Sequence, residues 1–355
     1  MPRTITIGDV EALAVGGTIL GGGGGGWPET GLRTGKLALD IGTVELWGPD
    51  EADPDWKVIT SAALGAPTEP GNTKPMHFIK AAQLLRDAGV EFQGVIAAEN
   101  GGHNSFGGWV IAAALGLPVV DTPGDGRAHP TAMMGSMGLH RLDYKSVKAG
   151  VTENCEVIAW GSLQTTSNVL RAQARDMRAL IAMARDPVPV SYSREHGAPG
   201  AINMAMELGY TWLEVKDKGP EERVQAANEF LGGELVCKGV ITEKKQEAKG
   251  GFDVGSTIIR SGDNEWELSY VNEYMALETD GERLATFPDL MTTFNEDGYP
   301  VTSAALDEGQ TIYVVNVAKD RILVGDGNKY PEIYEPIEAA LGKPMKRYLE
   351  GYLRD

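Results

Sequence analysis

Two short segments of the chain hold most of the side chains that could do chemistry. They span residues 99–104 (ENGGHN) and 121–130 (DTPGDGRAHP), and they contain two of the five histidines. Carboxylates beside imidazoles suit a divalent metal such as zinc, which would polarise a carbonyl-like group or activate water. Without a metal, the same groups would serve as general acid and base. The side chains concerned are Glu99, Asn100, His103, Asn104, Asp121, Asp125, Arg127 and His129.

A plainer interpretation of the same residues stands beside this one. Glycine-rich loops with Asp and Asn are often simple turns, because these side chains satisfy their own backbone. An arginine near an aspartate, as at Asp125 and Arg127, often forms only a salt bridge. The number of ionisable groups in both segments nevertheless favours a functional site.

The elements around the two segments predict that their side chains converge. Residues 94–98 (GVIAA) and 118–120 are short apolar runs of the kind found in buried parallel strands, and residues 109–115 between them predict a helix. Strand, helix, strand at this spacing is a βαβ unit, and ligands of open α/β sheets bind beyond the carboxyl ends of the strands. Glu99 and Asp121 directly follow the two strands, so we expect both loops to open at one edge of the sheet.

Six consecutive glycines, Gly21–Gly26, form the most unusual stretch of the chain. Such a run is not a stable helix or strand interior. It is either a flexible linker or a place where the backbone closely approaches a ligand or another chain. A linker so near the N-terminus would connect little, so we expect close approach, with Gly23 and Gly24 contributing to substrate binding.

The remaining pattern divides the chain into two halves. Helices are predicted at residues 76–88, 163–185, 200–208 and 221–231, and strands at 36–47 and 58–63. From Gly233 onward, short strand-like runs alternate with Gly, Asp and Asn turns, which is typical of a small sheet or barrel. Glu273 lies within one of these runs, where a charged residue faces either solvent, an interface or the site.

Composition excludes several classes of function. Acidic residues outnumber basic ones by 50 to 32, and the formal net charge of −18 repels phosphate backbones and anionic lipid heads. We therefore expect neither a nucleic-acid nor a membrane partner, and the absence of an obvious signal sequence predicts a cytoplasmic protein. The two cysteines, Cys155 and Cys237, are expected as free thiols.

Several ordered motifs resemble one known family. They are GGGGGGWPETG, LGAP, ENGGHNS, AAALGLPVVDTPGDGRAHP, KGGFDVGSTI, VNEYMALE and FPDLMTTFNEDGYPVTSAALDEG, and they extend over roughly residues 10–330. Together they resemble the family named for S-methyl thiohydantoin desulfurase, whose members often lie beside genes of the hydantoinase and oxoprolinase type. The resemblance implies a three-layer α/β N-terminal domain followed by a β-rich, barrel-like C-terminal domain. It also implies that water replaces sulfur on a thiohydantoin-type ring.

The resemblance extends to individual residues. Glu99, Asp121, Asp125 and Arg127 fall on matching motifs. His103 and His129 stand where other members often have apolar or small residues, which suggests either a histidine-supported metal or a different substrate.

The sequence thus predicts an α/β domain over residues 1–170 and a mixed segment leading into a β-rich domain over 171–355. The predicted function is a hydrolase-like enzyme acting on a five-membered cyclic amide or thioamide. The alternative is a non-catalytic subunit of a hydantoinase-type complex, and the glycine-rich composition is compatible with a homo-oligomer.

Roles are predicted for each candidate residue. The catalytic residues are Glu99, Asp121 and Asp125. The zinc ligands, or the residues that share the acid role, are His103 and His129. The substrate-binding residues are Gly23, Gly24, Asn100, Asn104, Arg127 and Glu273.

Overall fold

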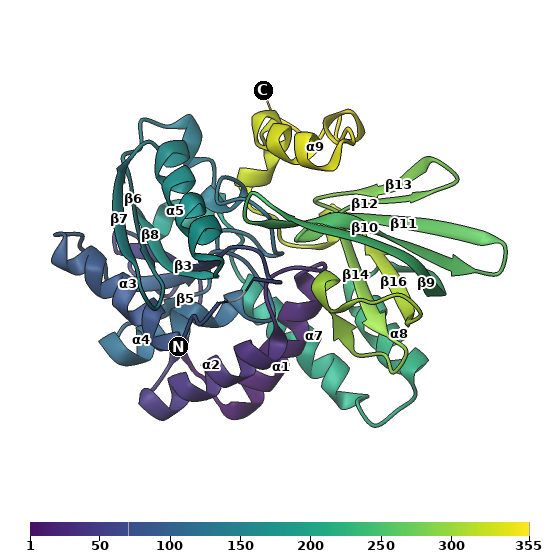
Figure 1. Cartoon of the computed structure of the whole chain (residues 1–355). Coiled ribbons are helices and arrows are strands. Elements are labelled where there is room, and N and C mark those ends of the chain that lie inside the picture. The colour runs from purple at the N-terminus through teal and green to yellow at the C-terminus, as the bar shows by residue number, and fades with distance from the viewer. Residues whose placement is uncertain (70, 355) are drawn as a thin grey trace.

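The computed structural model describes residues 1–69 and 71–354, which fold around two eight-stranded sheets (Figure 1). The first sheet has the order β1-β2-β5-β4-β3-β8-β6-β7. Its strands are β1 (Arg3–Thr4), β2 (Glu45–Trp47), β3 (Lys57–Leu64), β4 (Gly94–Ala97), β5 (Val119–Val120), β6 (Ser146–Val151), β7 (Glu156–Gly161) and β8 (Ile181–Pro189). Strands β2, β5, β4 and β3 run parallel, and the strands on either side of them pair antiparallel.

Helices cover both faces of this first sheet, which confirms the predicted three-layer arrangement. The helices are α1 (Ile7–Leu20), α2 (Pro28–Ile41), α3 (Pro75–Asp87), α4 (Gly107–Leu115), α5 (Leu163–Met177), α6 (Val190–His196) and α7 (Ala201–Glu214). Helices α3 and α4 pack together on one face, and α5 packs against β6 and β7 on the other. The predicted βαβ unit is confirmed, because β4 and β5 are adjacent and parallel with α4 between them in the chain.

The second sheet is antiparallel throughout and has the order β13-β12-β11-β10-β9-β16-β14-β15. Its strands are β9 (Glu234–Lys249), β10 (Phe252–Ser261), β11 (Asn264–Val271), β12 (Glu273–Thr279), β13 (Glu282–Thr286), β14 (Leu290–Asn295), β15 (Pro300–Val301) and β16 (Thr311–Val317). Helices α8 (Pro220–Leu231) and α9 (Glu335–Leu341) accompany it. The β-rich second half is thus confirmed. Of the two expected forms, a sheet or a barrel, the described strands build a sheet with β13 and β15 at its ends.

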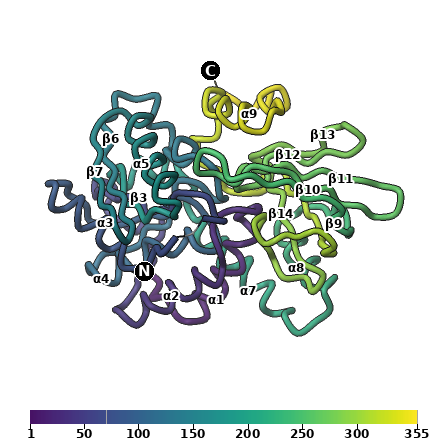
Figure 2. Tube along the Cα trace, in the orientation of Figure 1, coloured from purple at the N-terminus to yellow at the C-terminus, as the bar shows by residue number. Residues whose placement is uncertain are grey.

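Helices α1 and α7 join the two halves. They pack closely, because Gly16 of α1 faces the main chain of Ala205 in α7 and Gly209 of α7 faces Ala12. One apolar cluster includes Leu13 of α1 together with Phe294 and Tyr313 of the second sheet. The tube view in Figure 2 shows α1 and α7 beneath the junction of the two sheets and the C-terminal segment with α9 above it. The halves therefore share a core.

Two predicted elements are wrong. The stretch 36–47 is not one strand: residues 36–41 end helix α2, and only Glu45–Trp47 is extended. The stretch 163–185 is not one helix, because Arg178 adopts a left-handed φ of +47° that ends α5. Strand β8 then begins at Ile181, beyond the predicted domain boundary at residue 170, and lies inside the first sheet between β3 and β6.

Candidate active site

A cavity of about 50 Å³ lies where the carboxyl ends of β3 and β4 meet the second sheet. A buried water needs at least about 10–15 Å³ of such space, so the cavity has room for a few water molecules and not for a drug-sized ligand. We call it the inner cavity. The candidate residues that line it are Glu99, His103, Asn104, His129 and Glu273. The carboxylate, imidazole and amide side chains of both predicted segments therefore do converge.

Glu99 is the best-defined acid of the inner cavity. Its Oε1 accepts a hydrogen bond from Asn104 Nδ2 at 2.5 Å, and its Oε2 accepts one from the His129 main-chain N–H at 3.1 Å. Asn104 Oδ1 in turn accepts a hydrogen bond from the main-chain N–H of Ala63 in β3. Burial raises the pKa of Glu99 to about 8, and the nearby Asp125 charge adds to this rise. At neutral pH the carboxyl is therefore mostly protonated, with a pKa suited to acid–base work.

His129 lies beside this carboxyl and remains neutral. Its Nε2 is 3.2 Å from Glu99 Oε2. Burial lowers the pKa of His129 to about 3, and the cation of Arg185 contributes to the decrease. At this distance an ion pair would be expected, but the pKa values of both groups move toward their neutral forms. The contact at neutral pH is consequently that of a carboxylic acid with a neutral imidazole.

His103 occupies another wall of the inner cavity. Its ring meets Phe78 edge-on at a centroid distance of 5.8 Å, and its Cβ lies against Gly26. Burial, followed by the charge of Arg33, lowers the pKa of His103 to about 4, so this imidazole is also neutral at physiological pH.

The fit of a metal ion to these side chains is limited. Among residues 1–69 and 71–354, no group of three or more His, Cys, Asp or Glu side chains is arranged to hold a metal ion. Glu99 and His129 offer two adjacent ligands, whereas a catalytic zinc site usually has three from the protein. The predicted zinc therefore stays a prediction, and no chemical step below depends on it.

The glycine run reaches the inner cavity through its last members, Gly25 and Gly26. The Gly25 carbonyl accepts hydrogen bonds from the main-chain N–H groups of His103 and Asn104. A Cβ on Gly25 would overlap Gly101, and one on Gly24 would overlap the Glu273 carboxyl. The run thus lies close to other segments of its own chain, and its approach to a ligand or to another chain stays a prediction. Gly23 and Gly24 themselves lie outside the cavity lining, since the Gly23 carbonyl accepts hydrogen bonds from Ser303 of the second sheet.

Four other predicted residues lie behind the cavity walls. Asp121 accepts hydrogen bonds from the Ile202 and Asn203 main-chain N–H groups and thereby caps helix α7. Asn100 donates to the Ala201 carbonyl at 2.8 Å. These contacts hold α7 against the ends of β4 and β5. Asp121 has a raised pKa of about 6, caused by burial, so that it too is partly protonated below neutral pH.

Asp125 and Arg127 connect the loop after β5 to the second half of the chain. Asp125 accepts hydrogen bonds from the Gly325 N–H and the Asn328 amide. Arg127 donates to the carbonyl of Asp289 and lies over the ring of Phe287, with its Cζ 4.3 Å from the ring centroid. Both side chains are fully buried and hold the two halves together. Their assignment to catalysis and substrate binding stays a prediction.

Two charged residues of the cavity lining were missed from the sequence, Arg171 and Arg185. Arg171 donates to the carbonyls of Pro130 and Gly251 and stacks on Phe252 with a Cζ-to-centroid distance of 3.8 Å. It also lines a second, larger cavity of about 500 Å³, which shares Leu64, Thr131 and Ala132 with the inner one. This adjoining space, the outer cavity, offers room for a substituent on a ring.

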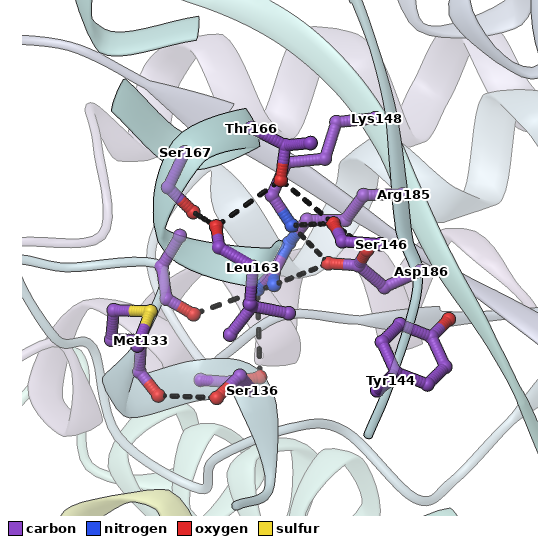
Figure 3. A network of polar contacts seen from close by, with 12 residues as sticks. Met133, Ser136, Tyr144, Ser146, Lys148, Leu163, Thr166, Ser167, Arg185 and Asp186 are labelled. Atoms are coloured by element: carbon purple, nitrogen blue, oxygen red, sulfur yellow. Dashed lines mark hydrogen bonds and ion pairs between the residues drawn. The ribbon is translucent and has the colours of Figure 1, made fainter. Parts of the chain in front are cut away.

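Arg185 is anchored by a buried charge network (Figure 3). Asp186 Oδ2 lies 3.4 Å from Arg185 Nη1 and is also paired with Lys148 Nζ, and Ser146 donates to Asp186 Oδ1 at 2.6 Å. Burial lowers the pKa of Lys148 to about 8, although Asp186 opposes this decrease. Arg185 Nε has no hydrogen-bond partner among the described residues. The signal for this site was the adjacent charge pair Arg185-Asp186 in an apolar run, which becomes visible only once the run is recognised as a strand.

Comparisons with known proteins agree with this architecture. A crystal structure of a protein from Chromobacterium violaceum is similar over 99% of this chain and 98% of its own, with a TM-score of 0.71 and 20% sequence identity. At that identity, the similarity shows the fold. No match was found among curated proteins. None of the described helices has the length and apolar character needed to cross a membrane.

Family models cover nearly the whole chain. The model described as S-Me-THD-like, N-terminal domain matches residues 8–156, and the model described as S-Me-THD-like, C-terminal domain matches residues 162–326. The first match contains the Gly-rich run, Glu99 and His129, and the second contains Arg171, Arg185 and Glu273. The chain therefore belongs to the S-Me-THD-like family.

Proposed function

We propose that this chain is a hydrolase that acts on a five-membered cyclic thioamide or amide of the thiohydantoin or hydantoin kind. The family takes its name from S-methyl thiohydantoin desulfurase, which supports loss of sulfur as the preferred reaction. The observation that carries the proposal is Glu99, a buried carboxyl with a pKa of about 8, held beside His129 in a small cavity that adjoins the larger outer cavity. Water attack on a ring carbon needs such a base.

Each residue around the inner cavity has a role in this proposal. In its ionised form, Glu99 takes a proton from water as the water oxygen bonds to the ring carbon. Asn104 and the main chain of His129 keep the carboxylate oriented toward the cavity. Arg185, with its free Nε, stabilises negative charge that develops on the ring during attack. The outer cavity receives the ring substituent.

Turnover by purified protein tests the proposal. An S-methyl thiohydantoin should release methanethiol, and the thiol is measured with a chromogenic disulfide. Glu99→Gln should lower kcat/KM by about 100-fold or more, because the variant cannot accept the proton from water. Glu91→Gln, an exposed change just before β4, is the matched control and should retain wild-type turnover. Equal activity of Glu99→Gln and the wild type would contradict the assignment.

Two further outcomes decide the remaining predictions. Elemental analysis, with turnover before and after chelation, tests the zinc prediction: about one equivalent of zinc and chelator-sensitive turnover would support it. The purified chain is also tested alone and together with a hydantoinase-type partner. Activity on thiohydantoins or hydantoins only in the complex would favour the alternative function, a non-catalytic accessory subunit.

A further inference from the structure

A second carboxyl, Glu273, reaches the inner cavity from the opposite half of the molecule. It is the first residue of β12 and is 2% exposed. Asn272, in the tight turn between β11 and β12, adopts a left-handed φ of +57°. The Asn272 side chain accepts a hydrogen bond from the Asp253 N–H, and its carbonyl accepts one from Ser303 Oγ at 2.6 Å. Asparagine tolerates this conformation better than other non-glycine residues, so the residue type fits the tight turn that positions Glu273.

The Glu273 carboxyl is only partly satisfied by the protein. Its Oε2 has no hydrogen-bond partner among the described residues, although it is buried in the cavity wall. Leaving such an atom unpaired is energetically costly, and most buried polar atoms have a partner. The other side of the carboxyl packs against Gly24, where no side chain would fit. A group held in place in this way, with one atom free, is arranged for a ligand.

The two carboxyls of the inner cavity have different tendencies to ionise. Burial raises the pKa of Glu273 well above its usual value, and the charge of Glu99 raises it further. Once Glu99 is ionised, Glu273 therefore keeps its proton. Pairs of acids whose environments separate their pKa values in this way commonly divide the base and acid roles between them.

We propose that Glu273 is the catalytic acid that protonates the departing sulfur, so that each half of the molecule contributes one carboxyl to the reaction. This inference rests on the proposed function. The bond from water oxygen to the ring carbon forms while Glu99 takes the water proton. The carbon–sulfur bond then breaks, its electron pair stays on sulfur, and Glu273 gives that sulfur a proton. The second water proton passes from the added oxygen to the ring nitrogen, so that the products are the ring carbonyl and a neutral thiol. The proton on Glu99 restores Glu273 through solvent.

Two substrates that differ in their leaving group test this role. Methanethiolate is a poor leaving group and needs protonation, whereas 4-nitrothiophenolate leaves readily without it. Glu273→Gln should lower kcat by about 100-fold or more for the S-methyl ring and by less than about 10-fold for the S-(4-nitrophenyl) ring. Ionisation of Glu273 should make wild-type turnover decrease at high pH, and the variant should lose this decrease. Glu273→Asp, which keeps the acid, should recover part of the S-methyl activity.

The controls separate this inference from the proposed function. Glu282→Gln, an exposed change at the start of β13, should behave as the wild type with both rings. Equal losses on both rings in Glu273→Gln, or an unaltered high-pH limb, would overturn the acid role while leaving the hydrolase intact. A wild-type protein that turns over neither ring would overturn both. If Glu273→Gln does not fold, Glu273→Asp with the same two rings decides the matter.

Discussion

The contact between Glu99 and His129 illustrates how burial changes the meaning of a short distance. Side chains of opposite formal charge at 3.2 Å are usually counted as an ion pair. Here desolvation acts on both partners, and their pKa values of about 8 and about 3 leave each neutral at pH 7. The cavity thus contains a protonated carboxyl that becomes a base as the pH rises. Turnover of the wild type should accordingly increase toward pH 8.

Glu99 also makes stability depend on pH. Its pKa rises from 4.5 in the unfolded chain to about 8 in the folded one, so folding favours the protonated form. The stability contributed by this group is fully present below pH 4.5 and is lost as the pH rises through 8. Within this window, the group should lower the free energy of unfolding by about 1.4 kcal/mol per pH unit.

Urea unfolding at several pH values measures this dependence. Glu99→Gln should remove this dependence on pH. The difference in the free energy of unfolding between the variant and the wild type should therefore shift in favour of the variant from pH 5 to pH 8. Glu91→Gln should follow the wild type, because this side chain is exposed. Parallel stability curves for Glu99→Gln and the wild type would show that Glu99 has an ordinary pKa.

At the scale of elements, the glycine run and the turn between β11 and β12 form one unit. The Gly22 carbonyl accepts a hydrogen bond from the Tyr274 N–H, and the Gly23 carbonyl accepts one from the Ser303 N–H, so the run pairs with the second sheet. On its other side, Gly25 contacts the loop after β4. The glycine run therefore contacts both the loop that follows Glu99 and the strand that begins at Glu273. In this way it fixes the distance between the two carboxyls.

Gly24→Ala tests that coupling. The added Cβ would overlap the Glu273 carboxyl and displace it from the cavity. A displacement of about 1 Å at a catalytic group is expected to lower kcat on the order of 100-fold, with a smaller loss of stability of about 1–3 kcal/mol. Steady-state kinetics and thermal unfolding measure the two effects. Gly219→Ala, before α8, is the control, since its Cβ would meet only Glu222 Oε2 at 3.4 Å. Unchanged kcat in Gly24→Ala would refute the coupling.

At the scale of the whole molecule, the two sheets do not have separate cores. One apolar cluster contains residues of β3, β4 and β5 together with Leu290, Tyr313 and Val315 of the second sheet. Arg127 and Asp125 add buried and partly buried hydrogen bonds across the same junction. Strand β8 comes after helix α5 in the chain, yet it pairs with β3 and β6 inside the first sheet. The halves recognised by the two family models therefore depend on each other.

Calorimetry checks this dependence. We expect a single unfolding transition whose calorimetric and van't Hoff enthalpies agree, because neither half buries its apolar face alone. Arg127→Met, which removes the hydrogen bonds to Pro288 and Asp289, should lower the midpoint of that single transition without splitting it. Two resolved transitions in the wild type would show that the halves fold independently.

Local patterns in the sequence were sufficient for much of this description. The βαβ unit around Glu99, the change to short strands after Gly233 and the close approach of the glycine run all follow from hydrophobic period and from the properties of glycine. These properties act within a few residues, so they are visible in any single sequence. The convergence of Glu99 and His129 followed from the same local reasoning.

Only the tertiary structure decided which polar residues face the inner cavity. Asp121 and Glu99 follow adjacent parallel strands, yet Asp121 caps α7 from a distant part of the chain, and Asp125 and Arg127 bind the second half. Arg185 became a cavity residue because β8 inserts between β3 and β6, which the helix-like composition of residues 163–185 concealed. Side-chain direction depends on partners far away in sequence, and burial, which sets the pKa values of Glu99 and Glu273, exists only once those partners have assembled.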